Sequence, residues 1–202
     1  MYVLGVDFGG GASKATLLDC NGKVVATATS EYPTHFGSNG KAEQNPIDWY
    51  DAATKNIRSV LTSIEPEKVK CVCFDAATHT AVLMDENANP VCDSVYWTDT
   101  RSVKEKEYLL ENFGQEIFEK CKHNVDTIWS LPEIMYVKNN FPDTYAKVKK
   151  ITFAKDFVRG KFTGDFVTCN NRMLCTCKFI EHGRFATLGE TTTHNNYYAF
   201  GF

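Results

Sequence analysis

The sequence predicts an α/β domain with a mixed sheet flanked by helices, and the order of its segments carries this prediction. Strand-like runs come first, with an apolar run over residues 2–7 and further runs at 14–19 and 24–30. From residue 46 onwards, helical spacing alternates with short apolar runs as far as residue 164. Early strands followed by strands that alternate with helices are typical of α/β domains.

The first strands are joined by turns. Three glycines at 9–11 follow Asp7 and precede the second strand. An Asn-Gly pair at 21–22 separates the second and third strands and is a strong hairpin signal. Residues 31–45 are polar and rich in Pro, Gly and Asn, so we expect a surface loop there.

A long helix is expected next. Asn45 is a good N-cap residue, and Pro46 suits the first helical position. Apolar residues keep helical spacing from Trp49 to Ile64, and Pro66 ends the pattern.

The following segment, residues 69–75, is predicted to be a buried strand that ends in an aspartate. Cys71 and Cys73 alternate with a valine in this run, which favours their packing as small hydrophobes over a metal site. Residues 80–84 and 91–97 flank a polar segment and are predicted to form a second hairpin.

The pattern turns mainly helical from residue 100. Helices are predicted at 101–112, 114–120, 130–140, 142–149 and 154–162, with a short strand at 151–153. Residues 169–202 have no clean periodicity. We therefore expect one domain over residues 1–168 and an atypical tail over residues 169–202.

Composition and charge argue against several classes of protein. The 202 residues carry 22 basic and 25 acidic side chains, a formal net charge of −3, so we expect no nucleic-acid partner. No apolar window reaches the roughly 18 residues of a membrane-spanning helix, so we expect no membrane partner. The N-terminus has no basic leader, and the eight cysteines then fit a reduced, cytoplasmic protein.

The segment from Asp7 to Lys14 has the residue types of a phosphate site. Glycines let backbone N–H groups approach phosphates closely, and successive N–H groups form an anion nest. Asp7 at a strand end is placed to meet Mg²⁺ through its water shell, and Lys14 is a point charge for phosphate oxygens. A plain glycine hairpin is the alternative. The next element is a strand, so the segment is neither a Walker A loop nor a Rossmann turn.

Residues 5–14 resemble the first phosphate loop of the superfamily that contains sugar kinases, Hsp70 and actin. The resemblance implies a ribonuclease H-like fold, in which two domains close over ATP and substrate. Gly10 stands where this loop usually has threonine, which removes a hydroxyl group from the phosphate site. The resemblance implies that ATP and Mg²⁺ are bound by Asp7, Gly9, Gly10, Gly11, Ser13 and Lys14.

Further segments resemble the FGGY family of carbohydrate kinases. Residues 42–49 are similar to the segment that opens the first long helix of the family. Residues 74–85 resemble the strand, loop and strand that carry a Met-His-Gly sequence in xylulose kinases. Residues 95–101 contain the Trp-x-Asp-x-Arg sequence of the family, and 130–134 and 155–164 are similar to two scaffold segments.

These segments imply a sugar site made by Thr78, His79, Trp97, Asp99 and Arg101. His79 aligns with the histidine that hydrogen-bonds a sugar hydroxyl, although Thr78 replaces the methionine before it. An aromatic face such as that of Trp97 packs on the apolar side of a sugar, while Asp99 and Arg101 offer groups for sugar hydroxyls or for loop closure. A structural histidine and a helix N-cap at Asp99 are the alternatives.

The resemblance implies transfer of the ATP γ-phosphoryl group to a sugar hydroxyl, and His79 favours a ketopentose such as xylulose. In the family, the base aspartate and the C-terminal ATP-binding domain lie well beyond Thr168, so we expect the 202 residues to be inactive alone. A homodimer is compatible with the family. A non-catalytic sugar-binding or interaction fragment, another ATPase of the actin and Hsp70 superfamily, and a non-functional truncated product are the alternatives.

Overall fold

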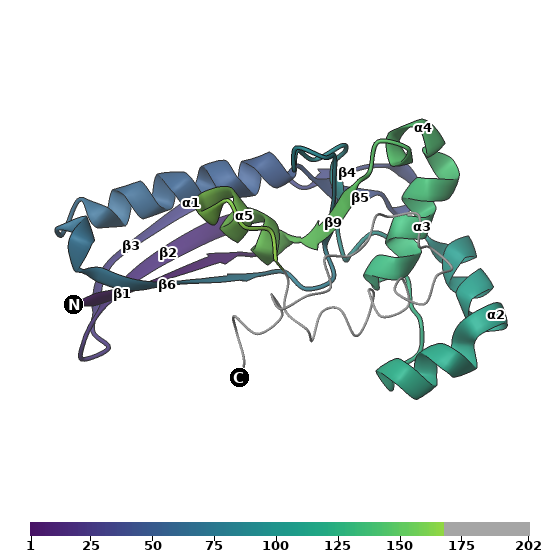
Figure 1. Ribbon diagram of the computed structural model, residues 1–202, viewed down its shortest axis with the longest axis horizontal. Coiled ribbons are helices and arrows are strands. Elements are labelled where there is room, and N and C mark those ends of the chain that lie inside the picture. The colour runs from purple at the N-terminus through teal and green to yellow at the C-terminus, as the bar shows by residue number, and fades with distance from the viewer. Residues whose placement is uncertain (168–202) are drawn as a thin grey trace.

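The computed structural model describes residues 1–167, and its elements confirm the predicted α/β class (Figure 1). The strands are β1 (Tyr2–Phe8), β2 (Ala12–Asp19), β3 (Val24–Glu31), β4 (His35–Phe36), β5 (Ala42–Gln44), β6 (Val69–Ala76), β7 (Ala81–Met84), β8 (Ser94–Val95) and β9 (Lys150–Phe153). The helices are α1 (Pro46–Leu61), α2 (Val103–Cys121), α3 (Ser130–Asn140), α4 (Pro142–Tyr145) and α5 (Ala154–Thr163), with short 3-10 turns η1 (Ser38–Gly40) and η2 (Pro66–Lys68). The predicted tail at 169–202 lies outside the described residues.

The largest sheet is mixed, as predicted, with the strand order β3-β2-β1-β6. β1 pairs antiparallel with β2 and parallel with β6. Near the end of β1, Asp7 is opposite Lys14 on one side and Asp75 on the other. The sheet therefore gathers three charged residues at one end.

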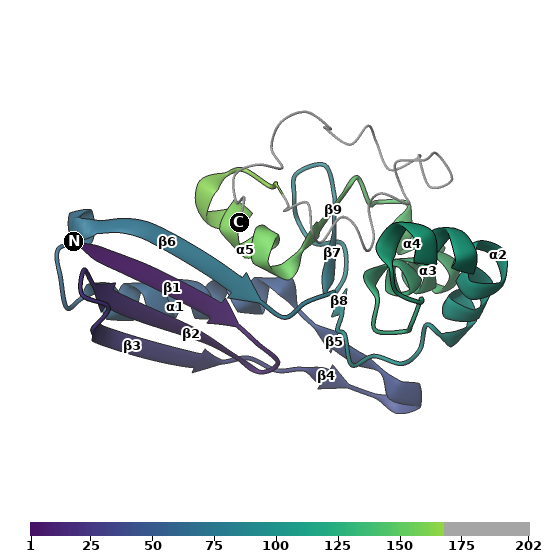
Figure 2. The same cartoon turned by 90° about the horizontal axis from the view of Figure 1, so that it is seen from below.

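Helices α1 and α5 cover one face of this sheet (Figures 1 and 2). Alternate residues of β1, Leu4, Val6 and Phe8, are buried in one cluster with Trp49 of α1 and Phe157 of α5. Alternation with a period of two is what a strand with one covered face requires. The residues of β1 between them face the other side of the sheet.

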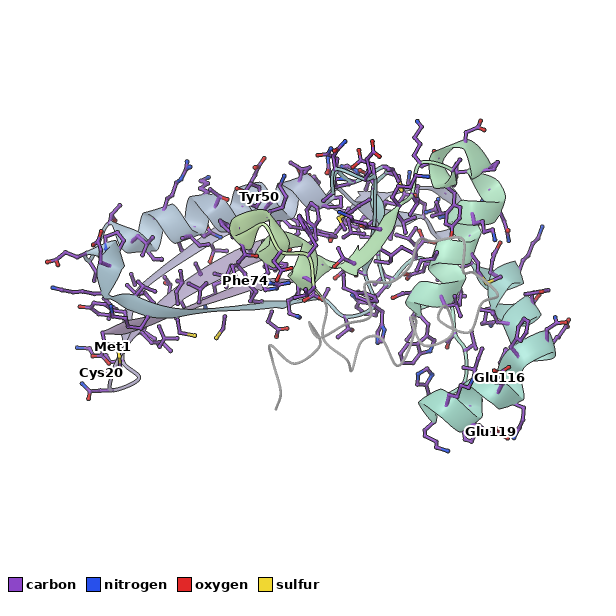
Figure 3. All side chains as sticks on the ribbon, viewed as in Figure 1. Met1, Cys20, Tyr50, Phe74, Glu116 and Glu119 are labelled. Atoms are coloured by element: carbon purple, nitrogen blue, oxygen red, sulfur yellow. The ribbon has the colours of Figure 1, made fainter. Side chains whose placement is uncertain are left out.

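Aromatic contacts join α5 to the sheet and to α1, in the region of the labelled Tyr50 and Phe74 (Figure 3). The ring of Phe74 stacks on that of Phe162 with centroids 5.6 Å apart, and Tyr50 lies 5.0 Å from the same ring. α1 begins at its predicted cap, where Asn45 Oδ1 accepts a hydrogen bond from the N–H of Ile47 at 2.9 Å. The first long helix and the last one are thereby fixed to the same side of the sheet.

The second predicted hairpin is confirmed only next to its turn. The two predicted segments meet there through the N–H of Val91, which donates to the carbonyl of Leu83 at 2.9 Å. Beyond this point they separate, because β7 pairs with β9 and β8 pairs with β5, each antiparallel. The turn between them is present, because Asp85 Oδ1 accepts hydrogen bonds from the N–H groups of Asn87 and Asn89 at 2.9 Å. An isolated bridge from Met84 to Pro90 follows the turn, and proline has no N–H with which to extend a ladder.

Three other boundaries differ from the prediction. α2 is one helix where two were predicted. It continues through Gly114, which lies between the buried residues Leu109 and Ile117, because a single glycine destabilises a helix by only about 1 kcal/mol. The predicted loop at 31–45 contains β4, η1 and β5. The predicted helix at 142–149 ends early as α4, and the N–H of Lys149 instead donates to the carbonyl of Met84 at 2.8 Å.

The predicted burial of residues 69–75 is also wrong. Strand β6 is present, but Cys71, Val72 and Cys73 are exposed, and 42% of the Val72 surface is accessible. β6 is the end strand of its sheet, and within residues 1–167 no other strand pairs with its outer edge. The apolar run predicted the strand correctly, whereas burial depends on neighbours that the run itself does not specify.

Helices α2, α3 and α4 gather at the end of the molecule away from the N-terminus (Figure 1). The short sheets β4-β5-β8 and β7-β9 lie between these helices and the large sheet (Figure 2). Within residues 1–167, none of the helices has the length and apolar character needed to cross a membrane.

Candidate functional site

The glycines at 9–11 form the turn between β1 and β2, as predicted. Their carbonyl groups are tied to the surrounding chain. Tyr32 Oη donates to the carbonyl of the first glycine at 2.6 Å, while Thr34 Oγ1 and Gln44 Nε2 donate to that of the second at 2.9 and 2.8 Å. Gln44 Oε1 in turn accepts from Trp49 Nε1 at 3.0 Å. Sequence reasoning missed these donors, most of which lie in the predicted surface loop.

The conformation of the turn differs from that of a typical anion nest. Positive φ angles among the described glycines are confined to Gly22, Gly40 and Gly164, so the turn contains no left-handed glycine. A Cβ at position 10 would lie 3.0 Å from Tyr96 Oη, a tight contact that Tyr96 would have to relieve by moving a few tenths of an ångström. The glycine that stands in place of the threonine of related loops therefore leaves room for the Tyr96 hydroxyl.

The predicted phosphate-binding residues separate onto two faces. Ser13 is fully buried on the face that α1 covers, and its carbonyl accepts from Asn56 Nδ2 at 2.8 Å. Its position does not support the predicted contact between the Ser13 side chain and a phosphate. Asp7 and Lys14 are exposed on the opposite face, where a ligand can reach both side chains.

Asp7, Lys14 and Asp75 line a shallow groove of about 300 Å³ on this exposed face. Partial burial raises the pKa of Asp7 above its usual value, and the negative charge of Asp75 raises it further. A bound cation would relieve that repulsion, so the two carboxylates suit a divalent metal ion that keeps part of its water shell. The sequence indicates an aspartate at the end of β6. Its place beside Asp7 follows from the parallel pairing of β1 with β6, which is not visible in the sequence.

The segment around Asp99 is held by an ion-pair network. Asp99 is 1% exposed and accepts hydrogen bonds from the N–H of Ala42 at 2.8 Å and from the N–H of Arg101 at 2.9 Å. The guanidinium of Arg101 donates to both Asp99 oxygens and to Glu43 Oε1, and it lies 4.8 Å from the ring centroid of Tyr136. These contacts connect the residues after β8 to β5. Of the two predicted roles of Asp99 and Arg101, sugar contact and loop closure, the geometry therefore supports loop closure.

Trp97 and His79 are the predicted sugar-site residues whose rings remain accessible. Trp97 is 42% exposed and packs its ring 5.9 Å from that of Tyr96. His79 is half-buried with a positive φ of 56°, a backbone conformation that is uncommon outside glycine. Its ring meets Trp129 edge-on at 4.2 Å, and its carbonyl accepts from Ser130 Oγ at 2.9 Å, so the start of α3 positions it. Thr78, before it, is exposed.

Two contacts join these segments to the glycine turn. The N–H of Ala77 donates to the carbonyl of Phe8 at 3.1 Å, which places the loop containing His79 directly after the end of β1. Tyr96, which directly precedes Trp97, approaches the turn so closely that a Cβ at Gly10 would lie 3.0 Å from its Oη. The fold therefore places the predicted phosphate and sugar segments next to each other.

Comparison with known proteins identifies the family. The sequence profile of the FGGY family of carbohydrate kinases, N-terminal domain, matches residues 2–177. The chain belongs to the FGGY family. This match confirms the predicted resemblance, and it extends beyond the last described residue.

Individual relatives agree with this assignment. The xylulose kinase of Lactococcus lactis subsp. lactis (strain IL1403) is 31% identical over 173 residues, which cover 83% of this chain and 34% of that protein. The gluconokinase of Bacillus subtilis (strain 168) is 25% identical over 167 residues, 82% of this chain and 33% of the relative. The chain therefore spans about a third of the length of the curated relatives it matches.

The fold has the same relatives. The structure of a ligand-bound xylulose kinase from Lactobacillus acidophilus superimposes with a TM-score of 0.80 and 23% identity, over 87% of this chain and 36% of that one. The similarity confirms the predicted ribonuclease H-like fold of the actin, Hsp70 and sugar kinase superfamily.

One buried acid of this FGGY domain was not predicted as a site residue. Glu133 of α3 is 2% exposed, and neither of its carboxylate oxygens has a hydrogen-bond partner. Burial raises its pKa well above the usual value, and the charge of Asp99 raises it further. Glu133 lines a small pocket with Ser94, whose Oγ is also buried without a partner. The sequence indicated only that this segment is scaffold.

Proposed function

We propose that this chain is the sugar-side half of an ATP-dependent carbohydrate kinase that transfers the γ-phosphoryl group of ATP to a sugar hydroxyl. The substrate class is a ketopentose such as xylulose. The observation that carries the proposal is the family match over residues 2–177, together with the placement of the glycine turn beside the loops of His79 and Trp97.

The groove of Asp7, Lys14 and Asp75 is the proposed phosphate side of the site. Both carboxylates line this groove, and we propose that they hold Mg²⁺, which when bound neutralises charge on the phosphates of ATP. Lys14 adds a positive charge for the phosphate oxygens. The tethered carbonyls of the glycine turn fix its backbone, so the N–H groups of Gly10 and Gly11 need little reorganisation to meet an anion. The N–H of Gly9 donates to the carbonyl of Ala12 at 3.0 Å.

The proposed sugar side uses the accessible rings. The exposed face of Trp97 packs against the apolar side of the sugar, and His79 hydrogen-bonds a hydroxyl. Asp99 and Arg101 act indirectly, because their buried network holds the loop that carries Trp97. The base that takes the hydroxyl proton belongs to the part of the kinase that this chain does not include, so we expect sugar binding without turnover from these 202 residues.

Calorimetric titration of the chain with D-xylulose, with and without Mg-ATP, tests this function. We expect saturable heat that disappears in His79→Ala and Trp97→Ala. His35→Ala and Phe36→Ala are matched controls, because both residues are exposed in β4 and play no part in the proposed site. They should retain the wild-type affinity.

The same titration separates the alternatives. Binding of gluconate and not of xylulose would agree with the family assignment but would replace the proposed substrate. ATP binding with no effect of any sugar would favour a different ATPase of the superfamily. Absence of sugar binding in both this chain and the full-length protein would contradict the proposal.

A further inference from the structure

Cys71 and Cys73 form a pair of thiols on the exposed surface. They lie two residues apart on β6, and side chains with this spacing point to the same face of a strand. Their Sγ atoms are 3.7 Å apart, and both residues are exposed. The sequence predicted that they pack inside the protein, so the structure gives them a different chemical environment from the expected one.

Strand pairing holds the backbone of the two cysteines in place. β6 is hydrogen-bonded along its length to β1, with Val3 opposite Cys71 and Gly5 opposite Cys73. Gly5 has no side chain, and with Cys73 it lines the groove that also contains Asp7. One thiol of the pair therefore faces an open space on a regular sheet.

The spacing suits simultaneous binding of both sulfurs to one soft atom. Two thiolates bonded at about 2.3 Å to one centre lie about 3.3–3.8 Å apart for bond angles between about 90° and 110°, a range that contains the observed separation. Soft centres select thiolate ligands over oxygen. Within residues 1–167, however, no group of three or more His, Cys, Asp or Glu residues is arranged to hold a metal ion. The pair offers two sulfurs and no third protein ligand.

The pair suits a trivalent atom that already carries one substituent, because such an atom needs only two sulfur ligands from the protein. We propose that Cys71 and Cys73 form a chelating dithiol for monosubstituted trivalent arsenicals. The juxtaposition of two exposed thiols at 3.7 Å on one paired strand carries the proposal, which is independent of the proposed kinase function.

The reaction requires no oxidant or reductant. An arsenical R–As=O loses its oxygen, two As–S bonds form, and the two thiol protons leave with the oxygen as one water molecule. Arsenic remains trivalent, and both sulfurs keep their oxidation state. A lone thiol such as Cys20, exposed in the turn after β2, forms a single As–S bond. Closing the second bond within the same molecule typically strengthens binding by a factor of about 10²–10⁴.

Phenylarsine oxide is the probe for this site. The sequence contains a second Cys-x-Cys at 175–177 and a further cysteine at 169, so the experiment uses the full chain with Cys169, Cys175 and Cys177 replaced by serine. Intact mass spectrometry counts bound arsenical, and competition with a small dithiol gives the affinity. We expect one tightly bound equivalent, lost on addition of the dithiol but not of an equal concentration of a monothiol.

Single substitutions test whether the bound phenylarsine oxide is held by Cys71 and Cys73. Cys71→Ser and Cys73→Ser should each weaken binding by roughly 10²–10⁴-fold, whereas Cys20→Ser should leave it unchanged. Because Cys71 and Cys73 are exposed, serine at either position should leave the circular dichroism spectrum intact, which excludes loss of folding as the cause. Wild-type affinity in Cys71→Ser or Cys73→Ser, or an adduct that a monothiol removes equally well, would overturn the proposal.

Discussion

Removal of the Asp99 carboxylate should destabilise the domain strongly. Asp99→Ala leaves the N–H of Ala42 and the N–H of Arg101 without their acceptor, and an unsatisfied buried donor costs about 1–3 kcal/mol. It also removes one partner of an ion pair whose side chains are 1% and 11% exposed, a change that typically costs about 3–5 kcal/mol. These contributions overlap, because both describe the same oxygens. We therefore expect a loss of about 3–5 kcal/mol in the free energy of unfolding.

Urea unfolding followed by far-UV circular dichroism measures this loss, since Trp97 lies too close to the substitution for fluorescence to be a neutral probe. Asp99→Asn keeps the shape of the side chain and one acceptor oxygen, so it should cost less, about 1–3 kcal/mol. Asp51→Ala is the matched control, because Asp51 is exposed on α1. Its effect should stay within about 0.5 kcal/mol.

The competing interpretation makes a different prediction. If Asp99 served mainly as a sugar ligand, Asp99→Ala would abolish sugar binding with a change in stability within the range of the control. A loss below about 1 kcal/mol would therefore refute the reasoning that the buried network, and not the sugar, uses this carboxylate.

Three further predictions concern stability. Glu133 has a raised pKa in the folded domain because it is buried, so its contribution is fully present below the unfolded pKa of about 4.3 and is lost as pH rises towards the folded pKa. Glu133→Gln should reduce the change of the urea unfolding midpoint with pH between pH 5 and 7. The same pH dependence as in the wild type would contradict this. Gly40→Ala should cost about 1–3 kcal/mol in thermal unfolding, because φ is 80° and a Cβ collides with Thr100, whereas Gly11→Ala should be nearly neutral. Gln44→Ala should cost about 1–3 kcal/mol in urea unfolding, because it leaves a buried indole N–H unpaired, and a neutral result would show that another acceptor replaces it.

Features set by neighbouring residues could be predicted from the sequence. The glycine turn and the strands that flank it follow from an apolar run, three glycines and a second run. The start of α1 follows from Asn45 and Pro46, and its cap forms the expected hydrogen bond. The position of Asp7 and Lys14 at paired strand ends follows from the same local pattern.

Features set by long-range pairing could not. Asp75 reaches the Asp7 groove because β6 pairs parallel with β1, a contact between segments about seventy residues apart in the sequence. The exposure of Cys71 depends on β6 being the end strand, which its own apolar pattern does not reveal. The close approach of Tyr96 to Gly10 depends on a distant loop, which the glycine turn itself does not reveal.

Assignment of roles within the Trp-x-Asp-x-Arg segment also needed the structure. The residue types of Asp99 and Arg101 suit a sugar hydroxyl or a loop closure equally well. Burial and the Ala42 and Glu43 contacts distinguish the two, because they occupy the carboxylate and guanidinium groups within the protein. Trp97 has no such partners in the described hydrogen bonds, and its ring stays accessible.

The most direct test of the proposed kinase function is phosphoryl transfer by the full-length protein that contains this domain. Phosphorus NMR follows Mg-ATP and D-xylulose in the presence of the wild-type protein and of Asp7→Asn. We predict formation of a sugar phosphate with the wild type, at a rate that Asp7→Asn lowers by roughly 10–100-fold, as for an outer-shell metal ligand. ATP hydrolysis with no phosphorylated sugar, for xylulose and for other sugars, would contradict the assignment of this chain as the sugar-side half of a carbohydrate kinase.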